Sequence, residues 1–284
     1  MLRLSYFLAQ SVLTASLLAC ASIQAAELPA PVAASLAQIS PSANLGEITP
    51  FEDAGETLYN VEVQTPGSSD AREWYFDGKG IPLGVQTFEK ELPPALLESL
   101  SLLLKQKNAE LADIVKLYES GKVLFEVEIS VGMESKVLGF YSDGRPAYTE
   151  AHLAELPKSL RKSIKQLEQT EGTVESILRL EASGRGLYQI AVNRPRKPLW
   201  ITFDASGAVV EREEVMDFKA TPESVQSAIL TKAGSGERVR VLRKRAGKTV
   251  EFEVHFFRDS KLHILHLSQT GETTGALLEP LSLP

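Results

Sequence analysis

Two glutamates two residues apart, Glu126 and Glu128, have a spacing that could support acid–base chemistry. Alternate side chains of a β-strand share one face, so the two carboxyl groups would lie about 7 Å apart, a separation that a general acid and a general base can use. A strand with one solvated face produces the same pattern routinely. The spacing therefore favours a solvated face, or a face that contacts a partner, over a catalytic site.

Histidine and cysteine add little further chemistry. His263 and His266 are three residues apart, which on a strand sends the two rings to opposite faces, where a shared metal ion is poorly served. None of the four histidines lies in a zinc-protease motif or beside a serine nucleophile motif. We therefore expect no catalytic residues, no metal and no cofactor.

The elements that must hold these side chains repeat four times, with a period of about 64 residues. One mark is an aromatic residue or leucine followed four residues later by glycine, at Phe76/Gly80, Phe140/Gly144, Phe203/Gly207 and Leu267/Gly271. A second is an aromatic-x-branched-x-apolar run that begins at Tyr59, Phe125, Tyr188 and Phe252. A third is a proline that opens each repeat, at Pro29, Pro93, Pro157 and Pro222.

Each repeat predicts one helix followed by antiparallel strands. Proline suits the start of a helix, and the aliphatic residues of Pro157 to Gln169 recur on one side. The helix is followed by a strand, a glycine turn, two strands with period-two alternation and a short last strand. The alternation places the repeated Phe or Leu on the face that packs against the helix. We expect the first strands at Ile48–Phe51, Ile114–Tyr118, Ser176–Leu180 and Val239–Leu242.

The order of these motifs resembles the PepSY-like and β-lactamase-inhibitor-protein-like (BLIP-like) domains of exported bacterial proteins. The resemblance covers residue 28 to the end of the chain and is best in the third repeat, at Leu156-Pro157, Gly184, Tyr188-Gln189-Ile190 and the run from Phe203 to Val209. It implies helix-plus-antiparallel-sheet units whose free sheet face binds a protein, in some families as an inhibitor of a secreted enzyme or as part of a propeptide.

The predicted binding surface is the sheet face opposite the helices. Large aromatic side chains on an exposed face are enriched where proteins bind, and carboxylates beside them suit a basic or mixed-charge partner. Burial against another repeat is the alternative for the aromatic members. The candidates are Glu62, Tyr75, Glu126, Glu128, Tyr141 and Trp200.

Charge is unevenly distributed along the chain. From Glu27 to Glu155 there are 9 Lys/Arg against 21 Asp/Glu, a balance of −12, whereas from Leu156 to Pro284 there are 20 against 16, a balance of +4. This favours an N-terminal and a C-terminal pair of repeats that attract each other, with two independently solvated halves as the alternative. One basic run consists of Arg240, Arg243, Lys244 and Arg245. Its simplest interpretation is a solvated turn, and the alternative is a site that binds an anionic headgroup or an acidic partner.

Residues 1–25 resemble an export signal, with Arg3 followed by an apolar stretch and then small residues. Cleavage before Ala26 suits the ordinary signal peptidase. The run from Leu17 to Cys20 resembles a lipobox, which would make Cys20, the single cysteine, a lipidation site on a periplasmic or outer-membrane lipoprotein. An exported acidic protein is not expected to bind nucleic acid.

Together these features predict an α+β protein of four tandem helix-plus-antiparallel-sheet units grouped as two pairs. The expected units are residues 28–91 (divergent), 92–155, 156–220 and 221–284. The predicted function is an exported, non-enzymatic protein-binding module, with inhibition or regulation of an envelope or secreted peptidase or hydrolase as its specific form. The alternatives are a structural or assembly scaffold of the bacterial envelope and, third, an envelope hydrolase.

Overall fold

Helices and strands follow one order along the chain. The structure is a computed structural model that describes residues 28–67, 70–119, 122–181, 184, 186–194 and 197–281. Each α-helix is followed by four strands. The first two groups are α2 (Ala30–Ile39), β1 (Asn44–Asp53), β2 (Glu56–Gln64), β3 (Ala71–Asp77), β4 (Pro82–Gln86), then η1 (Glu89–Glu91), α3 (Pro94–Lys107), β5 (Glu110–Glu119), β6 (Lys122–Val131), β7 (Glu134–Tyr141) and β8 (Pro146–Glu150). The remainder are η2 (Leu153–Glu155), α4 (Lys158–Thr170), β9 (Thr173–Leu180), β10 (Leu187–Asn193), β11 (Leu199–Phe203), β12 (Val209–Met216), η3 (Phe218–Ala220), α5 (Glu223–Ala233), β13 (Val239–Ala246), β14 (Thr249–Arg258), β15 (Lys261–Ser268) and β16 (Thr273–Pro280).

The strands form one 16-stranded antiparallel sheet in which strand order equals sequence order. Pairing continues from β4 to β5, from β8 to β9 and from β12 to β13, where the chain between the strands carries a helix. The predicted α+β class is confirmed. The four expected first strands lie within β1, β5, β9 and β13, and Pro157 is the residue just before α4.

The repeated Phe or Leu is buried against the helix that precedes it. Phe76 packs in one cluster with Val32 and Leu36 of α2. Phe140 lies with two leucines of α3, Phe203 with Leu160 and Ile164 of α4, and Leu267 with two aliphatic residues of α5. All four side chains are at most 5% exposed. The predicted burial of Phe76, Phe140, Phe203 and Leu267 is therefore confirmed.

The repeated glycine also contacts its helix. A Cβ atom built on Gly80 would lie 2.3 Å from the backbone oxygen of Pro31, and the hydroxyl of Ser35 donates a hydrogen bond of 2.7 Å to the carbonyl oxygen of Gly80. A similarly close approach to a helix carbonyl oxygen occurs at Gly144 and Gly271, and at Gly207 the closest atom is the hydroxyl oxygen of Ser163 on α4, at 2.5 Å. The glycine mark thus reports the contact between a strand-connecting turn and a helix.

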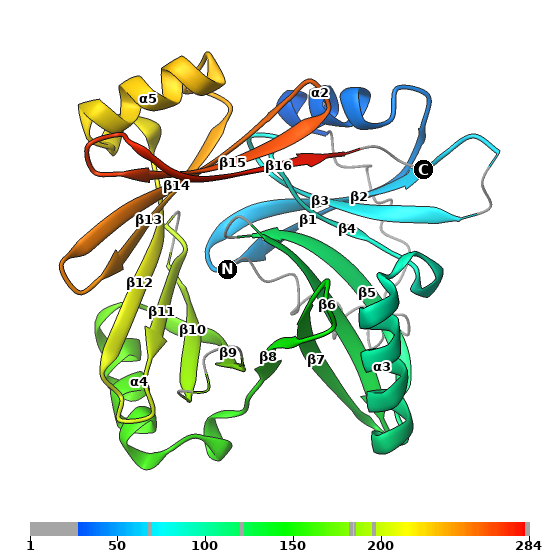
Figure 1. Cartoon of the computed structure of the whole chain (residues 1–284), viewed down its shortest axis with the longest axis vertical. Coiled ribbons are helices and arrows are strands. Elements are labelled where there is room, and N and C mark those ends of the chain that lie inside the picture. Colours follow the sequence, from blue (N-terminus) through cyan, green and yellow to red (C-terminus); the bar gives the residue numbers. More distant parts are fainter. Residues whose placement is uncertain are drawn as a thin grey trace, which may run out of the picture.

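The beginning and the end of the described chain pack together. In Figure 1, β15 and β16 run beside α2 and the strands that follow it. Phe257, Leu262 and Ile264 of β14 and β15 lie in the same hydrophobic cluster as α2. Ser260 donates a hydrogen bond of 2.8 Å to the carbonyl oxygen of Gln38. The first core is consequently completed by the last strands.

The turn between β1 and β2, residues 53–56, inserts into the opposite side of the molecule, and we call it the hairpin tip. The backbone N–H of Ala54 donates to a carboxylate oxygen of Glu175 at 2.7 Å, and both oxygens of Glu56 accept from Arg240 at 2.6 and 2.7 Å. Ala54 packs with Trp200 and Leu242. The hairpin tip therefore fills the sheet face that does not carry the helices.

Candidate functional site

Four of the six predicted contact residues are buried. Trp200 is 2% exposed, Tyr75 1%, Glu126 0% and Glu128 4%. The alternation was correct, because Tyr75 and Phe76 belong to different clusters on opposite faces of β3. The expectation that this face is open to solvent was wrong for these four residues.

The hairpin that β1 and β2 form explains the burial of the two aromatic residues. Phe51 of β1 meets Tyr75 edge to face, with ring centroids 6.4 Å apart. Ala54 of the hairpin tip covers Trp200. Tyr75 and Trp200 are therefore buried against another part of the chain, which was the alternative expected for the aromatic candidates.

The two glutamates that suggested acid–base chemistry are each held by a hydroxyl group. Glu126 accepts a hydrogen bond of 2.7 Å from the hydroxyl of Tyr148, and Glu128 accepts one from Ser135. Burial of Glu126 and Glu128 leaves little room for a substrate between them. Their contacts fit a structural role on the inner face of the sheet.

Two candidates keep partly exposed side chains, Glu62 on β2 and Tyr141 at the end of β7. Glu62 accepts a hydrogen bond of 3.3 Å from the backbone N–H of Glu47. The cations of Lys122 and Arg145 lie over the ring of Tyr141, 5.2 and 5.6 Å from its centroid. Nothing in the described contacts joins Glu62 to Tyr141, so the structure does not assemble the six residues into one surface.

The basic run is divided between the interior and the surface. The expectation of a solvated turn fits Arg243 and Arg245, which are exposed, but is wrong for Arg240, which is buried, and for Lys244, which is mostly buried. Arg240 is 1% exposed and, besides binding Glu56, lies 3.6 Å from Asp77. Burial raises the pKa of Asp77, although the charge of Arg240 opposes the rise. Arg243 is exposed and pairs with Glu214. Arg245 is also exposed and has no ion pair in the part of the chain that the structure describes.

Lys244 belongs to a second buried charge cluster. Its ammonium lies 2.7 Å from a carboxylate oxygen of Glu253, whose other oxygen lies 2.6 Å from Nε2 of His255. Burial works against ionisation of Glu253, but the hydrogen bond and charge of His255 and the charge of Lys244 outweigh it, so the pKa of Glu253 is lowered. Glu253 therefore stays ionised as the inner partner of two basic groups.

A cavity of about 380 Å³ is the best candidate site that sequence analysis missed. It lies between β3, β4, β5 and the end of the described chain, and we call it the β3–β5 cavity. Trp74, Tyr118 and Phe125 line it with aromatic surface, and Pro280 and Leu281 form one side. Because these residues are spread over more than 200 positions of the chain, no local spacing could have indicated the cavity.

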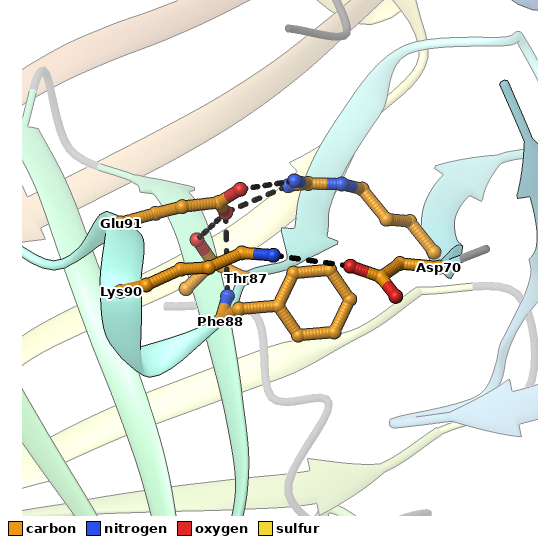
Figure 2. A network of polar contacts seen from close by, with 6 residues as sticks. Asp70, Thr87, Phe88, Lys90 and Glu91 are labelled. Carbon is orange, nitrogen blue, oxygen red and sulfur yellow. Dashed lines mark hydrogen bonds and ion pairs between the residues drawn. The ribbon is translucent and has the colours of Figure 1, made fainter. Parts of the chain in front are cut away.

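Glu91 organises the polar rim of the β3–β5 cavity (Figure 2). It accepts hydrogen bonds from both terminal nitrogens of Arg72, from the hydroxyl of Thr87 at 3.1 Å and from the backbone N–H of Phe88 at 3.3 Å. Burial disfavours ionisation of Glu91, but these bonds outweigh it and lower its pKa. The carboxylate is thus fixed in one position beside the cavity.

Lys90 extends this network outward. Its ammonium pairs with Asp70 at 3.1 Å and lies 5.3 Å from the ring centroid of Phe88 (Figure 2). The guanidinium of Arg72 lies 4.9 Å from the same centroid. The two cations therefore hold the ring of Phe88 in place.

Lys116 and Tyr118 supply the polar groups of the opposite wall. The Lys116 ammonium lies 2.6 Å from a carboxylate oxygen of Glu279 and 5.4 Å from the ring centroid of Tyr118. Burial, with the charge of Glu279 second, raises the pKa of Tyr118, so its hydroxyl remains protonated. That hydroxyl has no hydrogen-bond partner among the described residues and can donate to an occupant.

The described residues offer neither a metal-binding cluster nor a membrane-spanning helix. They contain no group of three or more His, Cys, Asp or Glu side chains that could hold a metal ion. No helix in the described ranges is both long and apolar enough to cross a membrane. The expected export signal, with Cys20, lies outside the described residues.

Comparison with known proteins finds similarity at the level of structure. No family model matches the sequence, and no curated protein matches it. A DUF2874 family protein from Bacteroides ovatus is similar over 43% of this chain and 87% of its own, with 12% identity and a TM-score of 0.37. A BLIP-like protein from Bacteroides fragilis is similar over 42% of this chain and 82% of its own, with 20% identity and a TM-score of 0.32.

Proposed function

We propose that this chain is an exported, non-enzymatic protein-binding module that takes an exposed segment of a partner protein into the β3–β5 cavity. The observation that carries the proposal is the composition of that cavity, an aromatic floor bordered by fixed ion pairs. Aromatic residues and arginine are enriched where proteins bind each other, and ligand sites are mostly apolar with a few placed polar groups.

The size and chemistry of the cavity define the segment. A volume of about 380 Å³ accommodates one or two side chains, so a loop or chain end fits and a folded domain does not. An apolar or aromatic side chain would pack against Trp74, Tyr118 and Phe125. A carbonyl or carboxylate group beside it would accept from the Tyr118 hydroxyl and lie near the Lys116 ammonium.

The predicted contact residues take two different roles in this proposal. Glu62 and Tyr141, which are partly exposed, remain candidate contacts for the same partner. The buried members support the sheet from inside; they are Tyr75, Glu126, Glu128 and Trp200. The proposal further takes the chain as four PepSY-like units, because each helix packs with the strands that follow it. It takes them as two pairs because the two halves of the chain carry net charges of opposite sign.

Binding is favoured over catalysis by what the cavity wall offers. The residues that line it include no histidine or cysteine, and its one carboxylate, Glu91, is already held by Arg72 and Thr87.

Export to the periplasm or the outer membrane is part of the proposal and rests on the character of residues 1–25. Inhibition of a secreted peptidase or hydrolase is the specific form we propose.

Affinity capture from a native bacterial envelope extract tests this function. The native full-length chain should retain a protein that the Lys116→Met variant does not retain. The substitution keeps the volume of the side chain and removes its charge, so loss of the protein would follow from the missing ammonium. Lys248→Met, an exposed lysine outside the cavity and away from Glu62 and Tyr141 in the sequence, is the matched control and should retain the same protein. Equal retention by both variants, with far-UV circular dichroism unchanged, would place the binding surface elsewhere.

The captured protein and the purified chain also distinguish the proposed binding function from a scaffold and from a hydrolase. A scaffold predicts no protein that depends on the β3–β5 cavity. A hydrolase predicts turnover of peptide, ester or glycan substrates by the purified chain. Inhibition predicts that the captured protein is an enzyme whose activity falls when the chain is added.

A further inference from the structure

Helix α4 presents a face of unpaired positive charge beside an exposed apolar residue. Lys158, Arg161, Lys162 and Lys165 are all exposed, and they line a hollow of about 1000 Å³ together with Leu153 and Ala154 of η2. None of the four cations has an ion pair in the described ranges of the chain. We call these six residues the α4 face.

The charges of the α4 face are unfavourable for the helix itself. Lys158 is the first helical residue, at the positive end of the helix dipole, and the first turn has no acidic residue. Residues four apart on a helix are neighbours, so Lys158 repels Lys162 and Arg161 repels Lys165. In α5 the corresponding first residue is Glu223, which has the favourable sign. The arrangement on α4 therefore gains stability from an external anion.

The hollow indicates what kind of anion this is. Leu153 is 40% exposed, and the aliphatic stems of lysine and arginine add apolar surface beside their charges. Lys158 and Lys165 are separated by about 10 Å along the helix axis. In an extended peptide, side chains on one side recur about every 7 Å. A carboxylate, an apolar side chain and a second carboxylate at alternate positions therefore lie on one side, and the two carboxylates can reach both ends of the face.

We propose that the α4 face binds an acidic segment of a protein partner in which a hydrophobic side chain lies between carboxylates. The hydrophobic side chain contacts Leu153, and the carboxylates pair with the four cations. A hollow with an apolar floor favours a peptide over the flat surface of an anionic membrane, which would meet the cations alone. This surface lies outside the β3–β5 cavity, so it does not depend on the function proposed there.

The test measures binding of a fluorescent synthetic peptide to the full-length chain. In this peptide glutamate and leucine alternate at every second position with serine between them, so that their side chains lie on one side of the extended peptide. Neutralising the α4 face should weaken binding about 30-fold, since exposed ion pairs each contribute modestly. This variant carries Lys158→Gln, Arg161→Gln, Lys162→Gln and Lys165→Gln. The matched control removes the same charge from exposed lysines elsewhere and should bind as the native chain does; it carries Lys219→Gln, Lys232→Gln, Lys248→Gln and Lys261→Gln.

Two further variants separate charge from apolar contact. Leu153→Ser should weaken peptide binding about five-fold, because the leucine loses its buried contact with the peptide. A peptide with glutamine in place of glutamate should bind about 30-fold more weakly, because it loses the same ion pairs as the neutralised variant. Zero-length cross-links from the glutamate peptide, mapped by mass spectrometry, should fall on Lys158, Lys162 and Lys165.

Three results would overturn the proposal. One is absence of peptide binding to the native chain at low ionic strength. Another is equal binding by the neutralised α4 variant, with circular dichroism showing an intact fold. The third is binding of phosphatidylglycerol vesicles through these lysines without binding of the peptide, which would assign the face to a membrane.

Discussion

At the scale of single residues, packing of helix on sheet depends on four equivalent side chains. Each of them lies in a hydrophobic cluster with the aliphatic stripe of one helix; they are Phe76, Phe140, Phe203 and Leu267. Removing a buried aromatic ring loses its transfer free energy and leaves a cavity that the surroundings only partly fill.

Truncation of Phe140 or Phe203 should therefore be costly. Phe140→Ala and Phe203→Ala are each expected to lower the free energy of unfolding by about 3–5 kcal/mol. Urea denaturation followed by circular dichroism measures this loss. A decrease below about 1 kcal/mol in both variants would contradict the packing role.

Charged residues on the inner face should make stability sensitive to acid. The pKa of Glu253 is lowered in the folded chain, because His255 and Lys244 outweigh the effect of burial. The ionised Glu253 therefore contributes to the stability of the fold at pH values above the ordinary pKa of glutamate, and this contribution is lost as the pH falls below that pKa. Glu253→Gln should lose less stability than the native chain between about pH 5 and about pH 3.

Urea midpoints at both pH values measure this difference. Glu251→Gln is the control, because Glu251 lies on the same strand, is less buried and has no described ion pair. Parallel loss of stability in the Glu253→Gln variant and the native chain would show that Glu253 is not a source of acid sensitivity.

At the scale of elements, the turn after β3 and helix α2 are fitted to each other at Gly80. Its φ angle is +77°, and an added Cβ would press on the backbone of α2. Gly67 has a φ angle of +85° with open space around it. The two glycines separate the cost of backbone conformation from the cost of the helix contact.

Alanine substitution at these two positions should have different effects. Gly67→Ala is expected to cost about 1 kcal/mol, from backbone conformation alone. Gly80→Ala should cost about 2–4 kcal/mol, because the methyl group also displaces α2. Thermal and urea unfolding of both variants measures the comparison. Equal losses would show that the helix moves aside freely.

At the scale of the whole molecule, the two ends of the chain stabilise each other. β14 and β15 complete the core around α2, and Arg240 joins β13 to the hairpin tip. Unfolding of either end would expose apolar surface and leave charged groups unpaired. The described chain is therefore expected to unfold as one cooperative body.

The two tryptophans provide separate probes of this cooperativity. Trp74 lies in the α2 core, and Trp200 lies under the hairpin tip. In the Trp200→Phe variant, tryptophan fluorescence reports on the surroundings of Trp74. In the Trp74→Phe variant, it reports on the surroundings of Trp200. Each probe should coincide with the circular dichroism transition of the same variant in urea. A fluorescence transition that precedes the circular dichroism change would indicate independent parts.

The sequence by itself determined the elements and the core face of each strand. Proline marked where helices begin, period-two alternation separated Phe76 from Tyr75, and glycine marked the turns that meet the helices. These features are local, because helix starts, strand faces and turns depend on residues only a few positions apart. They indicated the α+β class and the antiparallel strands.

Only the tertiary structure decided what the opposite sheet face does. Alternation distinguishes two faces of a strand, but it does not say which of them is covered by a distant segment. The hairpin tip buries Trp200. Arg240 is buried in an ion pair with Glu56, which lies 184 positions away in the sequence. The β3–β5 cavity likewise requires Leu281 to lie beside Trp74. Contacts at such separations depend on how the continuous sheet curves, and no short-range pattern in the sequence encodes that curvature.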